Sequence, residues 1–303
     1  MAKGSFEAYR KALSDVYRGW WFAWPLTERV RVGDVRALYR GGSVTAGTLA
    51  GHGMEAKAGP AGAPGDITYD AGGTVAVRFK AAGVAAQGFT SVPLTEAGAL
   101  VEFRDERSAL IVYTGLEQSG FQDLAQLAGA LVARVWSGGW DPALLVVSDV
   151  VSARAGTVLI AEHAGASAEL RIEGAVGPEP LRLVDLAGRA GFSASSRLGL
   201  NWTGTDLTPC YRVVRVRRTW LNRVKEEYGT PQPGRGLAPG PAPPVLLEEA
   251  RDEAAAVIEH VEQTARGEHE EREERGVRGV REERGEHEER EERGDKVEPG
   301  GPA

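Results

Sequence analysis

The sequence predicts an α+β fold: a mostly antiparallel, twisted sheet with flanking helices, followed by a linker, one amphipathic helix and a charged low-complexity tail. Short runs of alternating apolar and polar residues, typical of half-buried strands, recur between residues 29 and 217. Only a few stretches have helical spacing, as expected where helices pack on a sheet of hairpins. A composition of 42% hydrophobic and 26% charged residues is sufficient to bury a core.

The net charge of −7 divides the chain into two unlike parts. Residues 1–228, which we take as the folded body, carry 25 Lys+Arg against 23 Asp+Glu, or +2, whereas residues 229–303 carry 11 against 20, or −9. A dedicated DNA-binding protein normally has a strong basic excess. We therefore expect no nucleic-acid partner.

Cysteine content and hydropathy indicate where the protein resides. Its single cysteine, Cys210, excludes a disulfide framework and is typical of a reducing compartment. No stretch approaches the roughly 18 to 20 apolar residues of a spanning helix, and residues 1–19 lack the apolar run of a signal peptide. A cytoplasmic protein is expected.

Helical spacing of apolar residues from Phe6 to Trp24 predicts one amphipathic helix, with Ser5 as a possible N-cap and Pro25 ending it. The far end of this segment is rich in aromatic residues: Trp20, Trp21, Phe22 and Trp24. Such a cluster suits either a hydrophobic anchor in the core or a membrane interface. The core anchor is the preferred interpretation.

The next elements are expected to be strands. Residues 29–40 form short alternating runs, and a loop rich in Gly, Ala and Pro covers residues 51–65. Residues 74–80 follow a possible hairpin turn at Gly72-Gly73 and alternate cleanly, with Val75, Val77 and Phe79 on one face. Residues 99–104 and 108–114 are predicted to pair with each other across a turn at Asp105-Glu106.

A helix is predicted next, with an apolar stripe from Phe121 to Val135. Residues 144–151 give the strongest strand signal, and we expect residues 157–161 and 168–173 to be adjacent strands of a meander. A strand over residues 211–217 closes the body. It places Arg215 and Arg217 on one face, which makes that face cationic at its end.

The C-terminal quarter has its own organisation. Residues 229–244 are rich in Pro and Gly and read as a linker. Residues 245–265 are predicted to form one helix whose apolar stripe needs a partner surface. Residues 266–303 contain the repeat Arg-Glu-Glu-Arg-Gly at a nine-residue period, with no apolar face, and are expected to be a disordered or fraying tail.

Familiar catalytic motifs are missing: there is no GxSxG elbow, phosphate loop, HExxH or GxGxxG sequence. His52 and His163 lack the spaced partners of a metal site, and both are interpreted as surface histidines. Cys210 is interpreted as a small packed residue. We therefore expect a protein that is not an enzyme and that uses no cofactor or metal.

Three motifs carry a family resemblance over about 40% of the chain, between residues 99 and 217. The helix contains an Asp-Leu pair in Phe121-Gln122-Asp123-Leu124. A strand of the type VVT…A…TV has its counterpart in residues 146–153 and 157–160, and a Gly-x-x-Leu-Thr-Pro-like turn in residues 204–211. In this order of elements the chain resembles the bacterial gasdermins. It differs from them in lacking a cysteine near the N-terminus and in having a long C-terminal segment.

The resemblance implies an autoinhibited, cytoplasmic protein of bacterial cell-death or antiviral defence. After an activating protease cuts near its C-terminus, it would bind membrane lipids, form a homo-oligomer and insert β-hairpins as a pore. Arg235, in Gly234-Arg235-Gly236, is then the cleavage candidate. The strand with Val75, Val77 and Phe79 is a candidate membrane hairpin, and residues 108–114 are a second candidate segment. The candidate lipid-contacting residues are aromatic or basic: Trp20, Trp21, Trp24, Arg212, Arg215, Arg217 and Arg218.

A second hypothesis remains open on the sequence. The chain is then a soluble, non-enzymatic binding or adaptor module, tethered to an assembly by its C-terminal helix and tail. The two hypotheses differ in whether the 245–265 helix docks on its own body or on a partner, and in whether the protein makes vesicles leak.

Overall fold

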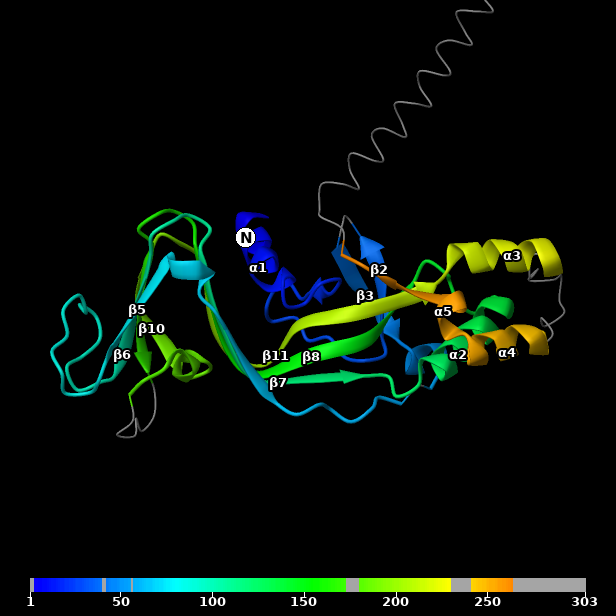
Figure 1. The fold of residues 1–303 in the computed structure, drawn as a ribbon, viewed down its shortest axis with the longest axis horizontal. Helices are drawn as coiled ribbons and strands as arrows, with labels where there is room; N and C mark the ends of the chain where they lie inside the picture. The colour runs from blue at the N-terminus through cyan, green and yellow to red at the C-terminus, as the bar shows by residue number, and fades with distance from the viewer. Residues whose placement is uncertain (1–2, 40–41, 56, 173–179, 230–240, 264–303) are drawn as a thin grey trace, which may run out of the picture.

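The computed structural model describes residues 3–39, 42–55, 57–172, 180–229 and 241–263. In these ranges it contains twelve strands in two antiparallel sheets, five α-helices and three short 3-10 helices. The α+β fold class predicted from the sequence is confirmed. The molecule is elongated, with a small sheet at one end and most helices at the other (Figure 1).

Two long strands form the spine of the larger sheet. β8 (Leu145–Ala161) and β11 (Leu198–Val216) pair antiparallel from Leu198 opposite Ala161 to Val214 opposite Val146. Six shorter strands extend this pair: β7 (Ala109–Gly120), β4 (Gly65–Tyr69), β2 (Asp34–Tyr39), β3 (Gly42–Thr48), β1 (Trp21–Phe22) and β12 (Ile258–Val261). β7 and β2 pair with β8, whereas β1 and β12 pair with β11. β4 pairs with β7, and β3 with β2.

The smaller sheet continues the larger one around a corner. Its strands are β5 (Val75–Lys80), β6 (Gly98–Phe103), β9 (Ser167–Ile172) and β10 (Ala190–Ser196), in the order β10-β9-β6-β5. Each follows or precedes one strand of the larger sheet: β4 leads to β5, β6 to β7, β8 to β9 and β10 to β11. The matching strands of the larger sheet, β4, β7, β8 and β11, are neighbours in this same order. The chain therefore forms two long hairpins, one from β4 to β7 and one from β8 to β11, and both bend at the corner.

Each of the four connections at the corner contains a residue with left-handed backbone geometry. These residues are Ala71 (φ 49°), Arg107 (φ 60°), Gly165 (φ 73°) and Arg197 (φ 57°). A left-handed residue between two extended segments changes the direction of the chain. The bend is therefore built into the backbone of all four connections.

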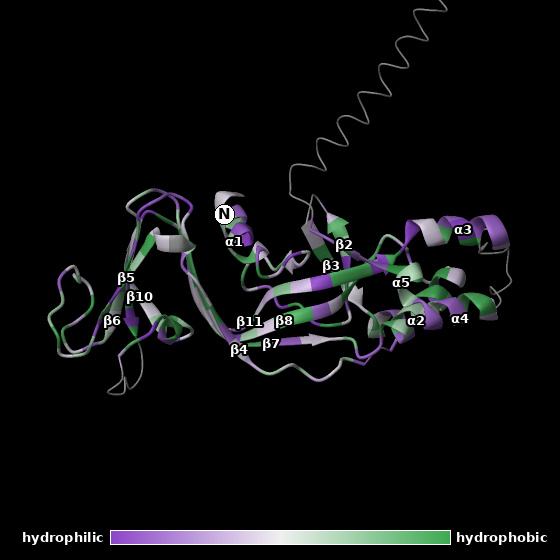
Figure 2. Ribbon diagram, viewed as in Figure 1, coloured by the Kyte–Doolittle hydropathy of each residue, from purple (hydrophilic) through white to green (hydrophobic). Residues whose placement is uncertain are grey.

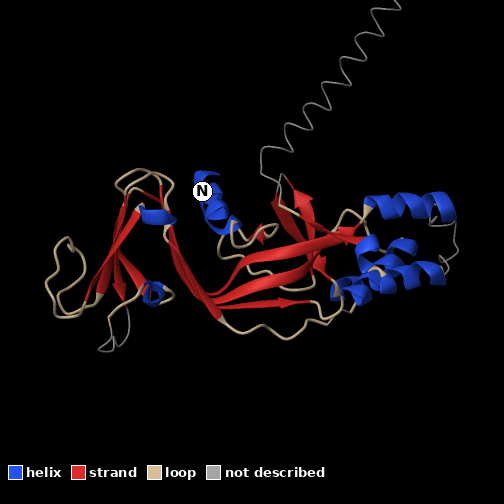
Figure 3. Cartoon of the chain, in the orientation of Figure 1, coloured by secondary structure: helices blue, strands red, loops and turns tan. Residues whose placement is uncertain are grey.

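The helices lie mainly at the end opposite to the small sheet (Figure 3). α2 (Leu124–Trp136), α3 (Arg218–Tyr228), α4 (Pro244–Asp252) and α5 (Ala254–Val257) gather there, whereas α1 (Lys3–Ser14) lies near the middle of the long strands. The carboxylate of Asp123 caps α2 by accepting hydrogen bonds from the backbone N–H groups of Ala125 and Gln126. The 3-10 helices are Ala50–His52, Ala71–Gly73 and Leu183–Leu186.

Both faces of β8 are covered along most of its length, as are those of β11 from Leu207 onward. Along β8, Val158 and Ile160 pack with Tyr9 and Leu13 of α1, while Leu159 belongs to the cluster under the small sheet. A third cluster joins the helices α2, α3, α4 and α5 at the far end. Figure 2 shows apolar residues along the long strands and again on α2 and α4. Burial on both faces explains the continuous apolar runs at the two ends of β8, residues 145–147 and 158–161.

The strand with Val75, Val77 and Phe79 confirms the predicted alternation, since these three side chains are half-buried against the small-sheet cluster. The predicted helix over residues 6–24 is wrong beyond Ser14. Trp21 and Phe22 instead form β1, because they satisfy the edge of β11 opposite Tyr211 and Cys210. Ser5 lies inside the helix rather than at its N-cap.

Three predictions of strand pairing are also wrong. Residues 99–104 and 108–114 do not pair with each other but belong to different sheets, and Gly72-Gly73 lies in a corner rather than a hairpin turn. Residues 144–151 and 157–161 are parts of one strand, β8, and residues 168–173 pair elsewhere, through β9. Alternation reveals which residues face a core but not which strand lies alongside.

Glu169 anchors the segment between β5 and β6. The residue is 7% exposed, and its carboxylate accepts hydrogen bonds from the Thr90 backbone N–H (2.9 Å), the Thr90 hydroxyl (2.6 Å) and the Ser91 backbone N–H (2.7 Å). Burial alone would raise the pKa of Glu169, but these hydrogen bonds outweigh it and hold the pKa below the ordinary value of 4.5.

We expect Glu169→Gln to lower the free energy of unfolding at pH 7 by about 1–2 kcal/mol, because an ionised acceptor of several hydrogen bonds is lost. Because folding lowers the pKa of Glu169, its ionised carboxylate stabilises the folded protein at any pH above the pKa of the unfolded chain. This stabilisation is lost as the pH falls through the pKa of the folded state. Urea unfolding at pH 7 and pH 3 should therefore show the difference shrinking in acid. Glu162→Gln, at an exposed position, is the control. A difference independent of pH would contradict this role.

Candidate functional site

The C-terminal segment folds back onto the body of the same chain. It comprises residues 241–263, with α4, α5 and β12, and we call it the clasp. The predicted single helix over 245–265 is broken at Glu253, which has an extended φ of −138°, and gives way to a strand at Ile258. The clasp helices lie beside α2, and β12 lies along β11 (Figure 1).

β12 of the clasp completes one edge of the large sheet. It pairs antiparallel with the end of β11, with Ile258 opposite Val216 and Val261 opposite Val213. The Arg217 backbone N–H donates to the Val257 carbonyl at 2.8 Å and extends the pairing by one bond. An open strand edge presents unpaired donors and acceptors, so the clasp satisfies groups that its removal would expose.

The clasp helices bury an apolar face against α2 and α3. Leu246 and Ala250 of α4 and Val257 of α5 are at most 2% exposed. They share one cluster with Leu127, Leu131, Trp140 and Trp220 of the body. Burial of one such aliphatic side chain contributes about 1.5–3 kcal/mol. The predicted need of this segment for a partner surface is thus met within the chain.

Two glutamates of the clasp engage basic residues of the body. Glu259 accepts a hydrogen bond from Nε of Arg215 at 2.8 Å, and both side chains are partly buried. Glu249 binds Arg223 and also accepts from Nε1 of Trp220 at 3.3 Å. The hydrogen bond to Glu249 raises the pKa of Arg223. Nε of Arg217 donates to the Ile258 carbonyl at 3.4 Å.

The aromatic N-terminal segment holds the far end of the clasp. Nε1 of Trp21 donates to the Val261 carbonyl at 2.6 Å, and the Phe22 backbone N–H donates to Oε1 of Gln263 at 3.1 Å. Trp21 is 2% exposed and stacks on Tyr211 of β11. Residues separated by more than 200 positions therefore meet beside β11.

The other candidate lipid-contacting residues have mixed environments. Trp20 is 6% exposed, and the guanidinium of Arg212 lies 4.6 Å from the centre of its ring. Trp24 is partly buried and packs against Phe6 and Tyr9. Arg218 is exposed. In this conformation Trp20 and Trp21 are core residues, so contact with lipid would require them to move.

The candidate membrane hairpin lies at the opposite end of the molecule. Val75, Val77 and Phe79 share the apolar face of the small sheet with buried residues of β6 and β9. Arg78 and Glu102 form an ion pair (2.6 Å) on the opposite face, which the segment between β5 and β6 covers in part. Residues 108–114 are not amphipathic as predicted, because residues 109–113 are buried on both faces. The sequence-predicted candidates thus form two separate groups, one around the clasp and one in the small sheet.

Arg235, the cleavage candidate, lies outside the described residues, as do residues 266–303 of the predicted tail. No helix within the described ranges is both long and apolar enough to cross a membrane. The described residues contain no group of three or more acidic, His or Cys side chains placed to hold a metal ion. Cys210 is fully buried as predicted, and burial raises the pKa of its thiol.

Sequence reasoning missed the contacts of Glu249 and Glu259. Both glutamates belong to a strongly acidic segment in which no single residue stands out. The β-branched pair Val257-Ile258, followed by Val261, was the available signal for a strand. The spacing of these residues also fits a helix, and for that reason the sequence predicts a helical stripe here.

Comparison with known proteins found a distant structural neighbour. No family model matches the chain, and no curated protein matches it. Among solved structures, a bacterial gasdermin from Bradyrhizobium tropiciagri matches with a TM-score of 0.30 and 14% identity, covering 69% of this chain and 86% of that one. The structural resemblance to a bacterial gasdermin is weak.

We expect Val257→Asp to release the clasp, because it places a charge at a fully buried position between α2 and β11. Hydrogen exchange of the backbone amides of residues 258–261 should accelerate at least tenfold. Val245→Asp is the matched control, since Val245 lies on the same segment but is 51% exposed. Equal exchange rates in the two variants would mean that the buried face does not hold the clasp.

Proposed function

We propose that this protein is an autoinhibited pore former that is cut between its body and the clasp, binds membrane and inserts β-hairpins. The main support for this proposal is that the clasp occupies the edge of β11. Acidic and carbonyl groups of the clasp also bind Arg215, Arg217 and Arg223. The region that is cationic in sequence is thus covered by an acidic segment of the same chain.

Electrostatics supports a change of state on cutting. Residues 229–303 carry −9 and residues 1–228 carry +2, so their separation leaves a body of net charge +2 in place of a chain of net charge −7. Each arginine near an anionic lipid surface contributes about 1 kcal/mol of attraction. Loss of Glu249 and Glu259 would free Arg223 and Arg215 for such contacts. Trp20, Trp21 and Trp24 lie beside the same edge and would add interfacial aromatic groups.

The small sheet supplies residues of the type needed to enter lipid. Its strands carry apolar side chains on one face, including Val77, Val101 and Leu170, and polar ones such as Arg78 and Glu102 on the other. This alternation is typical of membrane-inserted strands. Straightening the corner would join β4 to β5 over residues 65–80 and β6 to β7 over residues 98–120, so each joined strand would exceed the roughly 9–11 residues that a bilayer requires.

The remaining parts of the proposal follow from this activity. The uncut protein is cytoplasmic and silent, a protease acts near Arg235, and the cut body assembles with further copies at the membrane in a cell-death defence. No catalytic step, cofactor or nucleic acid is involved. Docking of the clasp on its own body, rather than on a partner, favours this proposal over the adaptor hypothesis.

The direct test is leakage from vesicles after controlled cutting. A specific protease site replaces residues 234–236, and the chain is cut in the presence of dye-filled phosphatidylserine vesicles. We expect release of dye only after cutting. If the cut protein stays monomeric, does not bind the vesicles at any salt concentration and leaves the dye inside, the pore proposal fails and the adaptor hypothesis becomes the better one.

Variants separate membrane binding from insertion. In the cut protein, Val77→Asp should preserve binding to vesicles but abolish leakage, because it charges the proposed lipid-facing side of β5. Ala76→Asp is the matched control: Ala76 is the neighbouring residue on the exposed face, and leakage should persist. Loss of leakage in both variants, or in neither, would contradict the assigned orientation of the strand.

Arg215 of β11 and Arg217, which follows that strand at the N-cap of α3, are tested by binding. Replacing Arg215 and Arg217 by Gln should weaken binding of the cut protein to anionic vesicles about thirtyfold, since two lipid contacts of about 1 kcal/mol are removed. Replacing Lys57 and Arg154, which are exposed elsewhere, removes the same charge and should have a smaller effect. Co-sedimentation across a salt series measures both, and equal losses would show a dependence on net charge alone.

A further inference from the structure

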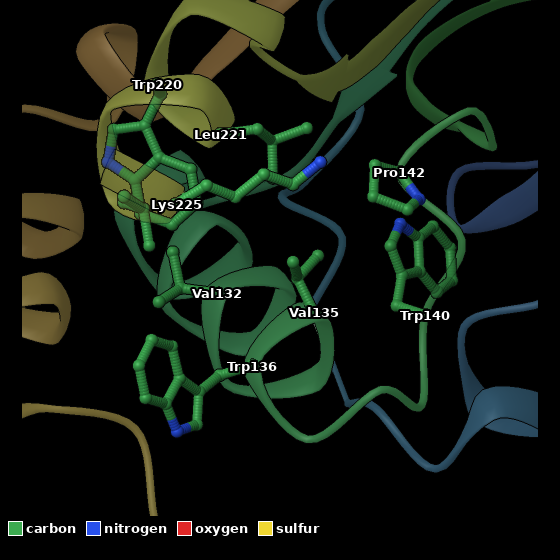
Figure 4. Close-up of a pocket in the computed structure, with 9 residues that line it drawn as sticks. Val132, Val135, Trp136, Trp140, Pro142, Trp220, Leu221 and Lys225 are labelled. Atoms are coloured by element: carbon green, nitrogen blue, oxygen red, sulfur yellow. The ribbon is translucent and has the colours of Figure 1, made fainter. Parts of the chain in front are cut away.

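A pocket of about 160 Å³ lies between α2 and α3 (Figure 4). Val132, Val135 and Trp136 of α2 form one wall, and Trp220 and Leu221 of α3 form another. Trp140, which follows α2, closes the pocket together with Pro142. The pocket therefore has three indole rings on its walls, and it contains no residue to which the proposed function assigns a role in the membrane.

The pocket has the size and lining of a small-molecule site. An apolar protein cavity of about 150 Å³ stays dry and binds a molecule the size of benzene. Walls of aliphatic and indole groups favour an aromatic occupant, because aromatic rings gain about 0.5–1.5 kcal/mol per pair beyond their buried area.

Two polar groups define what the occupant must carry. Trp140 is 5% exposed, and within the described part of the chain its indole N–H has no hydrogen-bond partner. A buried donor without an acceptor normally costs free energy. In Figure 4 the indole nitrogen lies beside Pro142, and the side chain of Lys225 extends along the pocket toward this same side. The nitrogen itself has less than 1 Å² of accessible surface, so a ligand reaches it only after a small displacement of Trp140 or Pro142. After that displacement, an acceptor with negative charge would satisfy both groups.

We propose that this pocket binds a small aromatic carboxylate. The ring of the ligand lies between α2 and α3, and its carboxylate accepts a hydrogen bond from Nε1 of Trp140 and pairs with the ammonium group of Lys225. This site is independent of the proposed pore activity.

Such a ligand would tie together the two helices that receive the clasp. α2 packs against α4 and α5, and Trp220 and Arg223 of α3 bind Glu249 of α4. A ligand that binds only the folded form stabilises it in proportion to the logarithm of its concentration. Occupancy of the pocket should therefore raise the melting temperature of the full chain.

The probe is 3-phenylpropionate, titrated into the full chain by calorimetry and tryptophan fluorescence. Three of the seven tryptophans line the pocket, so binding should change the emission spectrum. We expect a Kd of roughly 100 µM or tighter, from the size of the ligand, and at least tenfold weaker binding of the neutral 3-phenylpropionamide. A Kd weaker than 1 mM, or equal affinity for the acid and the amide, would overturn the proposal.

Variants of the polar groups localise the binding. Lys225→Met keeps the aliphatic stem and should weaken binding about tenfold, and Trp140→Phe should do likewise by removing the donor. Lys11→Met, at an exposed position on α1, is the control for charge and should leave the Kd unchanged. If Trp140→Phe fails to fold, Lys225→Met still tests the proposal, because Lys225 is exposed and its replacement leaves the core unchanged. Unchanged affinity in Lys225→Met would overturn the proposal.

Discussion

The hydrogen-bond ladder between β8 and β11 is the interaction on which the rest of the molecule depends. It runs from Leu198 opposite Ala161 to Val214 opposite Val146, and it connects the small sheet at one end with the helical cluster at the other. α1 packs on one face of the ladder, and the cluster of the small sheet extends onto the other. Every cluster of buried residues includes side chains from β8 or β11.

The same ladder explains why the two ends of the chain meet. Only one side of β11 is used by β8, and its other side is shared by β1, which comes from the N-terminal segment, and by β12 of the clasp. Trp21 joins these two short strands by donating to Val261. A strand as short as β1 or β12 gains little alone. Their stability on this edge comes from mutual contact and from the apolar clusters beneath them.

The sequence indicated the local elements well where one periodicity dominated. The alternation of Val75, Val77 and Phe79 predicted β5, and the apolar stripe from Phe121 to Val135 predicted α2, although not the N-cap at Asp123. Prediction from the sequence failed where the local pattern fits two kinds of secondary structure and tertiary contacts determine which one forms. Trp21 and Val257 both fit a helical stripe, yet one lies in a strand and the other ends a helix before a strand. Nothing local distinguishes Glu249 and Glu259 from neighbouring acids, because their roles depend on where α3 and β11 lie. The pocket between α2 and α3 was equally hidden, since its walls come from segments that meet only in the fold.

The corner between the two sheets has a conformational cost that straight strands would not have. Ala71, Arg107 and Arg197 are not glycines, yet each has a φ between 49° and 60°. L-residues in this region are disfavoured by about 1–2 kcal/mol each. The buried face of the small sheet offsets this cost while the bend persists. Straightening these connections would relieve that cost, so any environment that covered the same apolar face would compete with a bend that the backbone itself disfavours.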